Sequence, residues 1–124
     1  MSRARFLILL PCLGLLSGCI VAAAAAAGTG VLYVQGAALR SFPHDVERTY
    51  AGTVAALEEA DIIITTKTYD AVSGKVTGTG ADGKKVTVDL KSKGDGVTEV
   101  KVRVGTLGDR GRSEYLIGKI DEKV

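Results

Sequence analysis

Residues 85–105 read KVTVDLKSKGDGVTEVKVRVG and contain two runs of alternating apolar and polar side chains, separated by Gly94-Asp95-Gly96. The apolar positions of the two runs are Val86, Val88, Leu90, Val100, Val102 and Val104. Successive side chains of a strand point to opposite faces, so a period of two indicates a half-buried strand. The stretch therefore predicts two antiparallel strands with one buried and one solvent-facing side.

The preceding residues extend this sheet. Ile62 to Tyr69 is rich in Ile and Thr, Ser73-Gly74 predicts a turn, and Lys75 to Gly80 predicts the returning strand. Asp82-Gly83 is a strong hairpin signal that joins these residues to the strand that follows. A further strand is expected within Val31 to Leu39, centred on Leu32-Tyr33-Val34.

Two helices are predicted beside the sheet. The first starts with Ser41 or Phe42 as its N-cap and Pro43 near its first turn, and it ends at about residue 60. Its apolar stripe, which must face the sheet, is Val46, Tyr50, Val54 and Leu57. The second helix covers residues 112–124 and is amphipathic.

The predicted fold class is α+β. We expect an antiparallel β-meander of about four to five strands with the helices packed on one face. The order along the chain is β-α-β-β-β-β-α, in a single domain over residues 31–124.

The first 39 residues have a different composition from the rest. Of the 16 basic and 14 acidic residues, only Arg3 and Arg5 precede residue 40. A basic tip, a short apolar run over residues 6–16 and the small residues Ser17 and Gly18 are typical of a secretory signal peptide. Residues 1–18 are therefore interpreted as a leader.

The end of this leader is more specific. Leu16-Ser17-Gly18-Cys19 resembles the bacterial lipobox, in which a peptidase cuts before a cysteine that carries diacylglycerol. The resemblance implies that Cys19 is the lipid attachment site and that Leu16, Ser17, Gly18 and Cys19 are the residues recognised by the signal peptidase. Two or more acyl chains anchor a protein stably in a bilayer, whereas a single chain does so only marginally.

Residues 19–30 are then an acylated cysteine followed by an Ala- and Gly-rich spacer. Ile20 stands where Asp favours inner-membrane retention of lipoproteins, so the resemblance implies the outer membrane, facing the periplasm. Two alternatives stay open: an ordinary cleaved signal, or an uncleaved anchor over residues 6–27, because about 20 apolar residues suffice to span a bilayer.

The domain itself resembles a group of small bacterial lipoproteins classed as a domain of unknown function. The resemblance covers residues 50–109, and the final helix also fits. It is carried by an Ala-rich helix and by DAVSG at 70–74, ADGKKVTV at 81–88 and GDGVTEVKVRVG at 94–105. It implies the lipoprotein leader and the α+β fold, and it implies no catalytic residues.

Cysteine and charge narrow the functions that the sequence supports. Cys12 leaves with the leader and Cys19 is acylated, so the mature chain would have no free thiol for catalysis, zinc binding or a disulfide. Removal of residues 1–18 leaves 14 basic and 14 acidic residues, which does not favour a nucleic-acid partner.

One stretch of the sequence resembles two nucleotide-binding motifs. Residues 78–83, GTGADG, match the dinucleotide fingerprint, and with Lys84 they nearly complete a Walker A loop, although Lys85 stands where Ser or Thr should be. Both motifs need a helix directly after the loop to present backbone N–H groups to phosphate. Val86 to Leu90 predicts a strand instead, so we expect no nucleotide binding.

Other polar residues form no recognisable constellation. His44 is the only histidine and is expected at the surface, and the acidic residues show no calcium-loop spacing. The serines Ser41, Ser73, Ser92 and Ser113 are expected at caps and turns. We therefore expect no catalytic, cofactor-binding or metal-binding residues and a protein that is not an enzyme.

The sequence leaves two functions to compare. The first is a membrane-anchored envelope lipoprotein with a structural or protein-interaction role, whose contacts are the lipid bilayer through Cys19 and an envelope protein. The alternative is a periplasmic module that binds an apolar or glycan ligand in a groove opened by Gly78 and Gly80.

Overall fold

The computed structural model describes residues 30–124, and the compact unit within it is Val31–Val124. It contains six strands and two helices: β1 (Leu32–Val34), β2 (Ala37–Phe42), α2 (Val46–Glu59), β3 (Ile63–Tyr69), β4 (Ser73–Thr79), β5 (Lys85–Gly94), β6 (Val97–Val104) and α3 (Arg110–Lys123). The predicted α+β class is confirmed. Residues 1–29, which include the predicted leader and most of the spacer, lie outside the described part.

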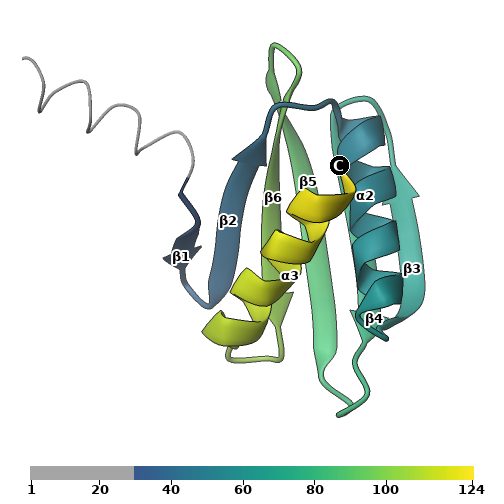
Figure 1. Ribbon diagram of the computed structural model, residues 1–124, viewed down its shortest axis with the longest axis vertical. Coiled ribbons are helices and arrows are strands. Elements are labelled where there is room, and N and C mark those ends of the chain that lie inside the picture. The colour runs from purple at the N-terminus through teal and green to yellow at the C-terminus, as the bar shows by residue number, and fades with distance from the viewer. Residues whose placement is uncertain (1–29) are drawn as a thin grey trace, which may run out of the picture. The chain divides into compact units, whose positions relative to one another are not determined.

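All six strands form one antiparallel sheet in the order β1-β2-β6-β5-β4-β3. Strands β3 to β6 are the predicted meander, and β2 returns from the start of the domain to pair with β6. Both helices lie on the same side of the sheet (Figure 1). Helix α2 contacts β3, β4, β5 and β6, and α3 contacts β2, β6 and α2.

The core lies between the sheet and the helices. Val86, Val88 and Leu90 of β5 and Val100, Val102 and Val104 of β6 are all buried there, as the alternation predicts. Buried side chains of the other elements complete the core: Phe42, Leu57, Ile117 and Ile120. The opposite side of the sheet carries no helix in the described chain. We call it the open face.

The start of the domain differs from the prediction. Residues 31–39 do not form one strand, because β1 and β2 make a hairpin at Gln35-Gly36. Both turn residues have positive φ, 52° and 81°, which a two-residue hairpin turn requires. Glycine adopts this backbone readily and Gln seldom does, so only half of the usual turn signal is present in the sequence.

The first helix also begins later than predicted. Ser41 and Phe42 belong to β2, and Asp45 is the N-cap, accepting a hydrogen bond from the backbone N–H of Arg48 at 2.9 Å. Phe42 cannot cap the helix because its side chain has no hydrogen-bond acceptor, and its ring is buried in the core. Similarly, Asp109 caps α3 through the N–H of Arg112, so the second helix starts at Arg110.

Small residues let the two helices approach each other. Thr49, Gly52, Thr53 and Ala56 are buried in α2, in addition to the predicted Val46 and Leu57, whereas Tyr50 and Val54 of the predicted stripe are only half-buried. A Cβ at Gly52 would lie 2.6 Å from Cγ1 of Val124, just beyond α3. The buried surface of α2 is thus shared between the sheet and α3, which a purely hydrophobic stripe does not reveal.

Candidate functional site

The four residues of the predicted lipobox, Leu16, Ser17, Gly18 and Cys19, precede the described residues, so the structure does not place them. Within residues 30–124, no helix has the length and apolar character needed to cross a membrane. The same residues contain no group of three or more His, Cys, Asp or Glu side chains arranged to hold a metal ion.

The nucleotide-like motif is part of a β-hairpin. Gly78 lies in β4, Gly83 has a φ of +80° in the turn, and β5 follows directly from Lys85. The predicted strand after the loop is therefore confirmed. Because no helix begins here, the backbone N–H groups do not form the phosphate cradle on which either motif depends.

The glycines of this motif mark close packing. A Cβ at Gly78 would lie 2.7 Å from the carbonyl oxygen of Ile63 and 2.8 Å from Cγ2 of Ile62. At Gly80, it would meet Oδ1 of Asp82 at 3.0 Å and Nη2 of Arg112 at 3.1 Å. The space beside both glycines is thus filled by β3 and by side chains, so they open no groove.

His44 is half-buried in the connection between β2 and α2. Its carbonyl oxygen accepts a hydrogen bond from Oγ1 of Thr98 on β6 at 2.8 Å. This contact gives the residue a structural role through its backbone, beside the Asp45 cap of α2.

The serines do not occupy the predicted caps and turns. Ser41, Ser73 and Ser92 lie in strands, and Ser113 lies in α3. The turn between β3 and β4 is made by Asp70, whose Oδ1 accepts from the N–H groups of Val72 and Ser73 at 2.8 and 2.9 Å. The predicted Ser73-Gly74 turn is wrong because both residues pair with β5.

The open face has no covering layer within the described domain, and its side chains are mainly polar. Its middle is a row of threonines, since Thr66 pairs with Thr77 and Thr77 pairs with Thr87. Thr65 lies in a β-bulge, and its hydroxyl donates to the carbonyl oxygen of Thr77 at 3.2 Å. The bulge adds one residue, which leaves Tyr69 on the helix side, where its ring stacks on Tyr50 at 4.3 Å.

Charged side chains surround this threonine row. The open-face cations are Lys75, Lys85, Lys91, Lys93, Lys101 and Arg103, and the open-face acids are Asp89 and Glu99. Asp89 pairs across the strands with both Lys75 and Lys101, and Glu99 pairs with Lys91. Six positive charges against two negative ones make this a basic surface, although the charges of the described chain balance overall.

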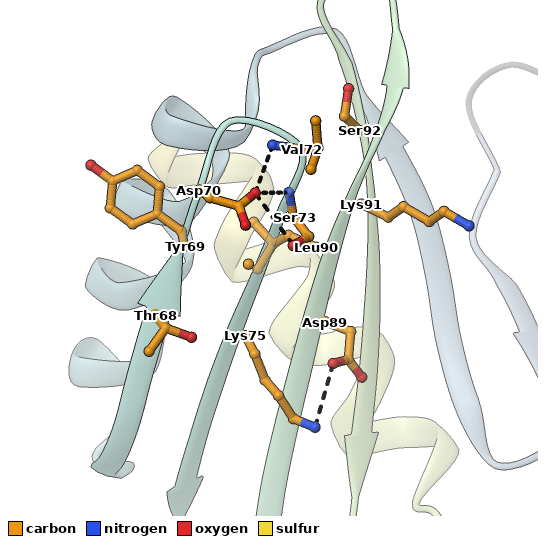
Figure 2. Close-up of a pocket in the computed structure, with 11 residues that line it drawn as sticks. Thr68, Tyr69, Asp70, Val72, Ser73, Lys75, Asp89, Leu90, Lys91 and Ser92 are labelled. Atoms are coloured by element: carbon orange, nitrogen blue, oxygen red, sulfur yellow. Dashed lines mark hydrogen bonds and ion pairs between the residues drawn. The ribbon is translucent and has the colours of Figure 1, made fainter.

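A depression lies where the open face meets the β3–β4 turn. Figure 2 shows Lys75 and Asp89 beside each other, with the Asp70 carboxylate above them bonded to Val72 and Ser73. Nζ of Lys75 lies 3.9 Å from Oδ1 of Asp89. The backbone N–H groups of Val72 and Ser73 hold the pKa of Asp70 below its usual range, and through its Oδ1 the carboxylate shapes the turn.

A second depression lies at the other end of the sheet, between the β4–β5 turn and the loop from β6 to α3. Nζ of Lys84 lies 3.7 Å from Oδ2 of Asp109, and Arg112 pairs with Asp82. The N–H of Lys84 and, secondarily, the Arg112 guanidinium lower the pKa of Asp82. These contacts fasten the start of α3 to the sheet, and the acids balance the cations, so this end is less basic than the open face.

Comparison with known families identifies the chain. The profile of a family described as "Protein of unknown function (DUF3568)" matches residues 4–123. The chain belongs to this family. The expected membership of a family of unknown function is confirmed, and the match covers most of the predicted leader and all but the last residue of the α+β domain of this DUF3568 protein. No curated protein matches the chain.

The basic open face is the feature that sequence reasoning missed. Its signal was present, since four of the polar positions in residues 85–105 that alternate with buried Val and Leu are Lys or Arg: Lys85, Lys91, Lys101 and Arg103. Net charge hid it because the acids lie mainly on and around the helices, as Glu47, Glu58, Glu59 and Asp61 do.

Proposed function

We propose that this DUF3568 protein is a bacterial envelope lipoprotein, anchored through acylated Cys19, whose α+β domain has a non-catalytic structural or interaction role. The observation that carries the role is the open face, where one side of a six-stranded sheet presents charged and threonine side chains that no other element of residues 30–124 covers. A polar sheet surface is suited to contact with another surface, because it offers many side chains at fixed spacings.

The lipid anchor is supported by the sequence. The lipobox-like Leu16-Ser17-Gly18-Cys19 follows an apolar run with a basic tip, and the chain becomes charged only from Arg40. Ile20 after the cysteine, where Asp favours inner-membrane retention of lipoproteins, supports sorting to the outer membrane with the domain in the periplasm.

The anchor is tested by labelling cells with radioactive palmitate. We expect the full chain and a Cys12→Ser variant to be labelled and processed, since Cys12 would leave with the leader. Cys19→Ser should remain uncleaved at this site and unlabelled. Equal labelling of Cys19→Ser and the unchanged chain would refute the lipoprotein proposal.

A module for an apolar or glycan ligand is the second candidate function. The observation in its favour is the depression beside the β3–β4 turn, where Val72 is 64% exposed near Leu90, Lys75 and Asp89. Backbone amide shifts of Val72 and Ser73 during titration with fatty acids or peptidoglycan fragments test it. Saturable shifts confined to this turn would favour the ligand module, and unchanged shifts would favour a role in surface contact.

A further inference from the structure

We propose that the open face of the sheet docks on an anionic phospholipid surface. The proposal deepens the function above and rests on it in one respect, because the lipid anchor is what keeps the domain near a bilayer. The partner is defined by its chemistry: a layer of phosphate-bearing headgroups with net negative charge.

The first argument is the separation of charge between the two sides of the domain. Six cations and two acids lie on the open face, while the acids of α2 and its flanking turns lie on the helix side. A neutral chain arranged in this way has a field that turns its basic side toward an anionic surface.

The second argument is the availability of these cations. Lys85, Lys91 and Lys101 are exposed, and none has an acidic group within 4.0 Å among the described residues. Lys75 and Lys93 form only long, exposed ion pairs, at 3.9 Å with Asp89 and 3.6 Å with Glu99. Such pairs contribute little to stability and can exchange for contacts with lipid phosphate at small cost.

The third argument is an apolar margin on the same face. Leu32 and Val34 of β1 are 65% and 50% exposed, and Leu32 lies opposite Leu39 of β2, which is half-buried on the open face. Leu39 is in turn paired with Lys101. Exposed aliphatic side chains bordered by lysine are the pattern with which proteins bind at a membrane interface.

The spacer favours a lipid surface over an acidic protein or polysaccharide. Only 11 peptide units separate Cys19 from Gly30, so even a fully extended spacer spans no more than about 40 Å. An anchored domain therefore meets the bilayer at an effective concentration that a diffusing partner does not match. The apolar margin belongs to β1, the first strand after that spacer.

A single tryptophan reports the contact, because the natural chain contains none. Ser41→Trp on the open face and Ala55→Trp on the exposed side of α2 form the matched pair of reporters. Each full chain is reconstituted in vesicles of phosphatidylcholine alone, or of phosphatidylcholine and phosphatidylglycerol in equal parts, with brominated acyl chains as the quencher. Circular dichroism tests whether both variants fold. If Ser41→Trp does not fold, Thr87→Trp, which also lies on the open face, takes its place.

We expect bromine to quench the fluorescence of the Ser41→Trp variant but not that of Ala55→Trp, and only in vesicles that contain phosphatidylglycerol. About 0.5 M salt should abolish the quenching, because the Debye length then falls to only a few Å. Adding Lys91→Gln and Lys101→Gln, which removes two surface charges, should lower the ratio of docked to undocked protein by roughly thirty-fold. Arg48→Gln with Lys67→Gln, which removes the same charge from the helix side, should leave this ratio unchanged.

Each other outcome has a defined meaning. Equal quenching of the two reporter variants, or quenching of Ser41→Trp that ignores lipid charge and salt, overturns the proposal. If the chain floats with both kinds of vesicle but the Ser41→Trp reporter is not quenched, docking is wrong while the anchor stands. Flotation only with anionic vesicles would instead refute the anchor and support docking. Concentration-dependent dimerisation without quenching would assign the open face to a second copy and overturn docking on lipid.

Discussion

Oγ1 of Thr98 on β6 donates a 2.8 Å hydrogen bond to the carbonyl oxygen of His44, 54 residues earlier in the chain. Thr98 is fully buried, and the bond holds the connection between β2 and α2 against the sheet. It thereby positions Asp45, the next residue, to cap the helix. The orientation of α2 is set by this polar contact as well as by the hydrophobic core.

Replacing this hydroxyl should be costly. Thr98→Val keeps the shape of the side chain but leaves the carbonyl of His44 without its donor, and we expect a loss of about 1–3 kcal/mol in the free energy of unfolding. Ser113→Ala is the matched control, because the buried hydroxyl of Ser113 has no hydrogen-bond partner within the described chain. It should be neutral or stabilising. Urea denaturation measures both, and a larger loss for Ser113→Ala would contradict this account.

Two Gly→Ala substitutions should have opposite signs. At Gly78 the added methyl would press on the backbone of Ile63, and we expect destabilisation of about 1–3 kcal/mol. At Gly118, exposed in α3, a Cβ meets nothing within 4 Å, so alanine should stabilise the protein by roughly 0.5–1 kcal/mol through helix propensity. Thermal unfolding of both variants tests this. A stabilising Gly78→Ala would contradict the close contact with Ile63, and a destabilising Gly118→Ala would contradict the argument from helix propensity.

The stability contributed by the contact between the C-terminal ends of α2 and α3 should depend on pH. Glu59 accepts hydrogen bonds from the ammonium groups of Lys123 and Lys119, which hold its pKa below the usual range. A carboxyl with a lowered pKa stabilises the fold above its unfolded pKa, and this contribution disappears as the pH falls through the folded value. We therefore expect Glu59→Gln to lower Tm at neutral pH and to have no effect in acid, well below the ordinary carboxyl pKa of about 4.3.

The stability contributed by the Glu59–Lys119 ion pair should also change at alkaline pH. Glu59 raises the pKa of Lys119, so the lysine's contribution to stability is fully present below its unfolded pKa and is lost as the pH rises through the folded value. Tm measured against pH for the unchanged protein, Glu59→Gln and Glu58→Gln tests both limbs. Glu58 is the control because it has no cationic partner within 4.0 Å in residues 30–124. Identical curves for the two variants would contradict the prediction.

The aromatic contact over the β3 edge should also be measurable. The rings of Tyr50 and Tyr69 are tilted by 32° with their centroids 4.3 Å apart. Truncation by Tyr69→Ala should cost about 1 kcal/mol or more, because aromatic pairing adds to the area buried. Tyr115→Ala, on an exposed part of α3, should cost less than half as much. Equal losses in the free energy of unfolding, measured by guanidinium denaturation, would show that the contact with Tyr50 contributes nothing to stability.

Much of this fold is predictable from the pattern of residues 85–105. The buried positions of β5 and β6, the meander and the helix side follow from alternation, since burial of every second side chain is a local consequence of strand geometry. The β1–β2 hairpin was missed because Gln35 adopts a backbone that local preference disfavours. The Asp45 cap was missed because the position of Phe42 is decided by the core, which local sequence does not reveal.

The candidate surface was harder to predict than the fold. Its cations were visible as individual lysines, but their meeting on one face depends on the strand order and on the cross-strand neighbours. Net charge is the sum over the chain and carries no information on where the charges lie. The proposed lipobox needs no such information, because its four residues are adjacent in the sequence.

The β-bulge at Thr65 and the short length of β1 have a consequence for association between copies. The sheet has two edges, β3 and β1, and continuation of one onto the other would be a head-to-tail contact that never closes and so grows into fibres. The bulge interrupts the regular spacing of backbone groups along β3, and β1 offers only three residues for pairing. Within residues 30–124, both edges of the sheet are thus poor templates for open-ended polymerisation.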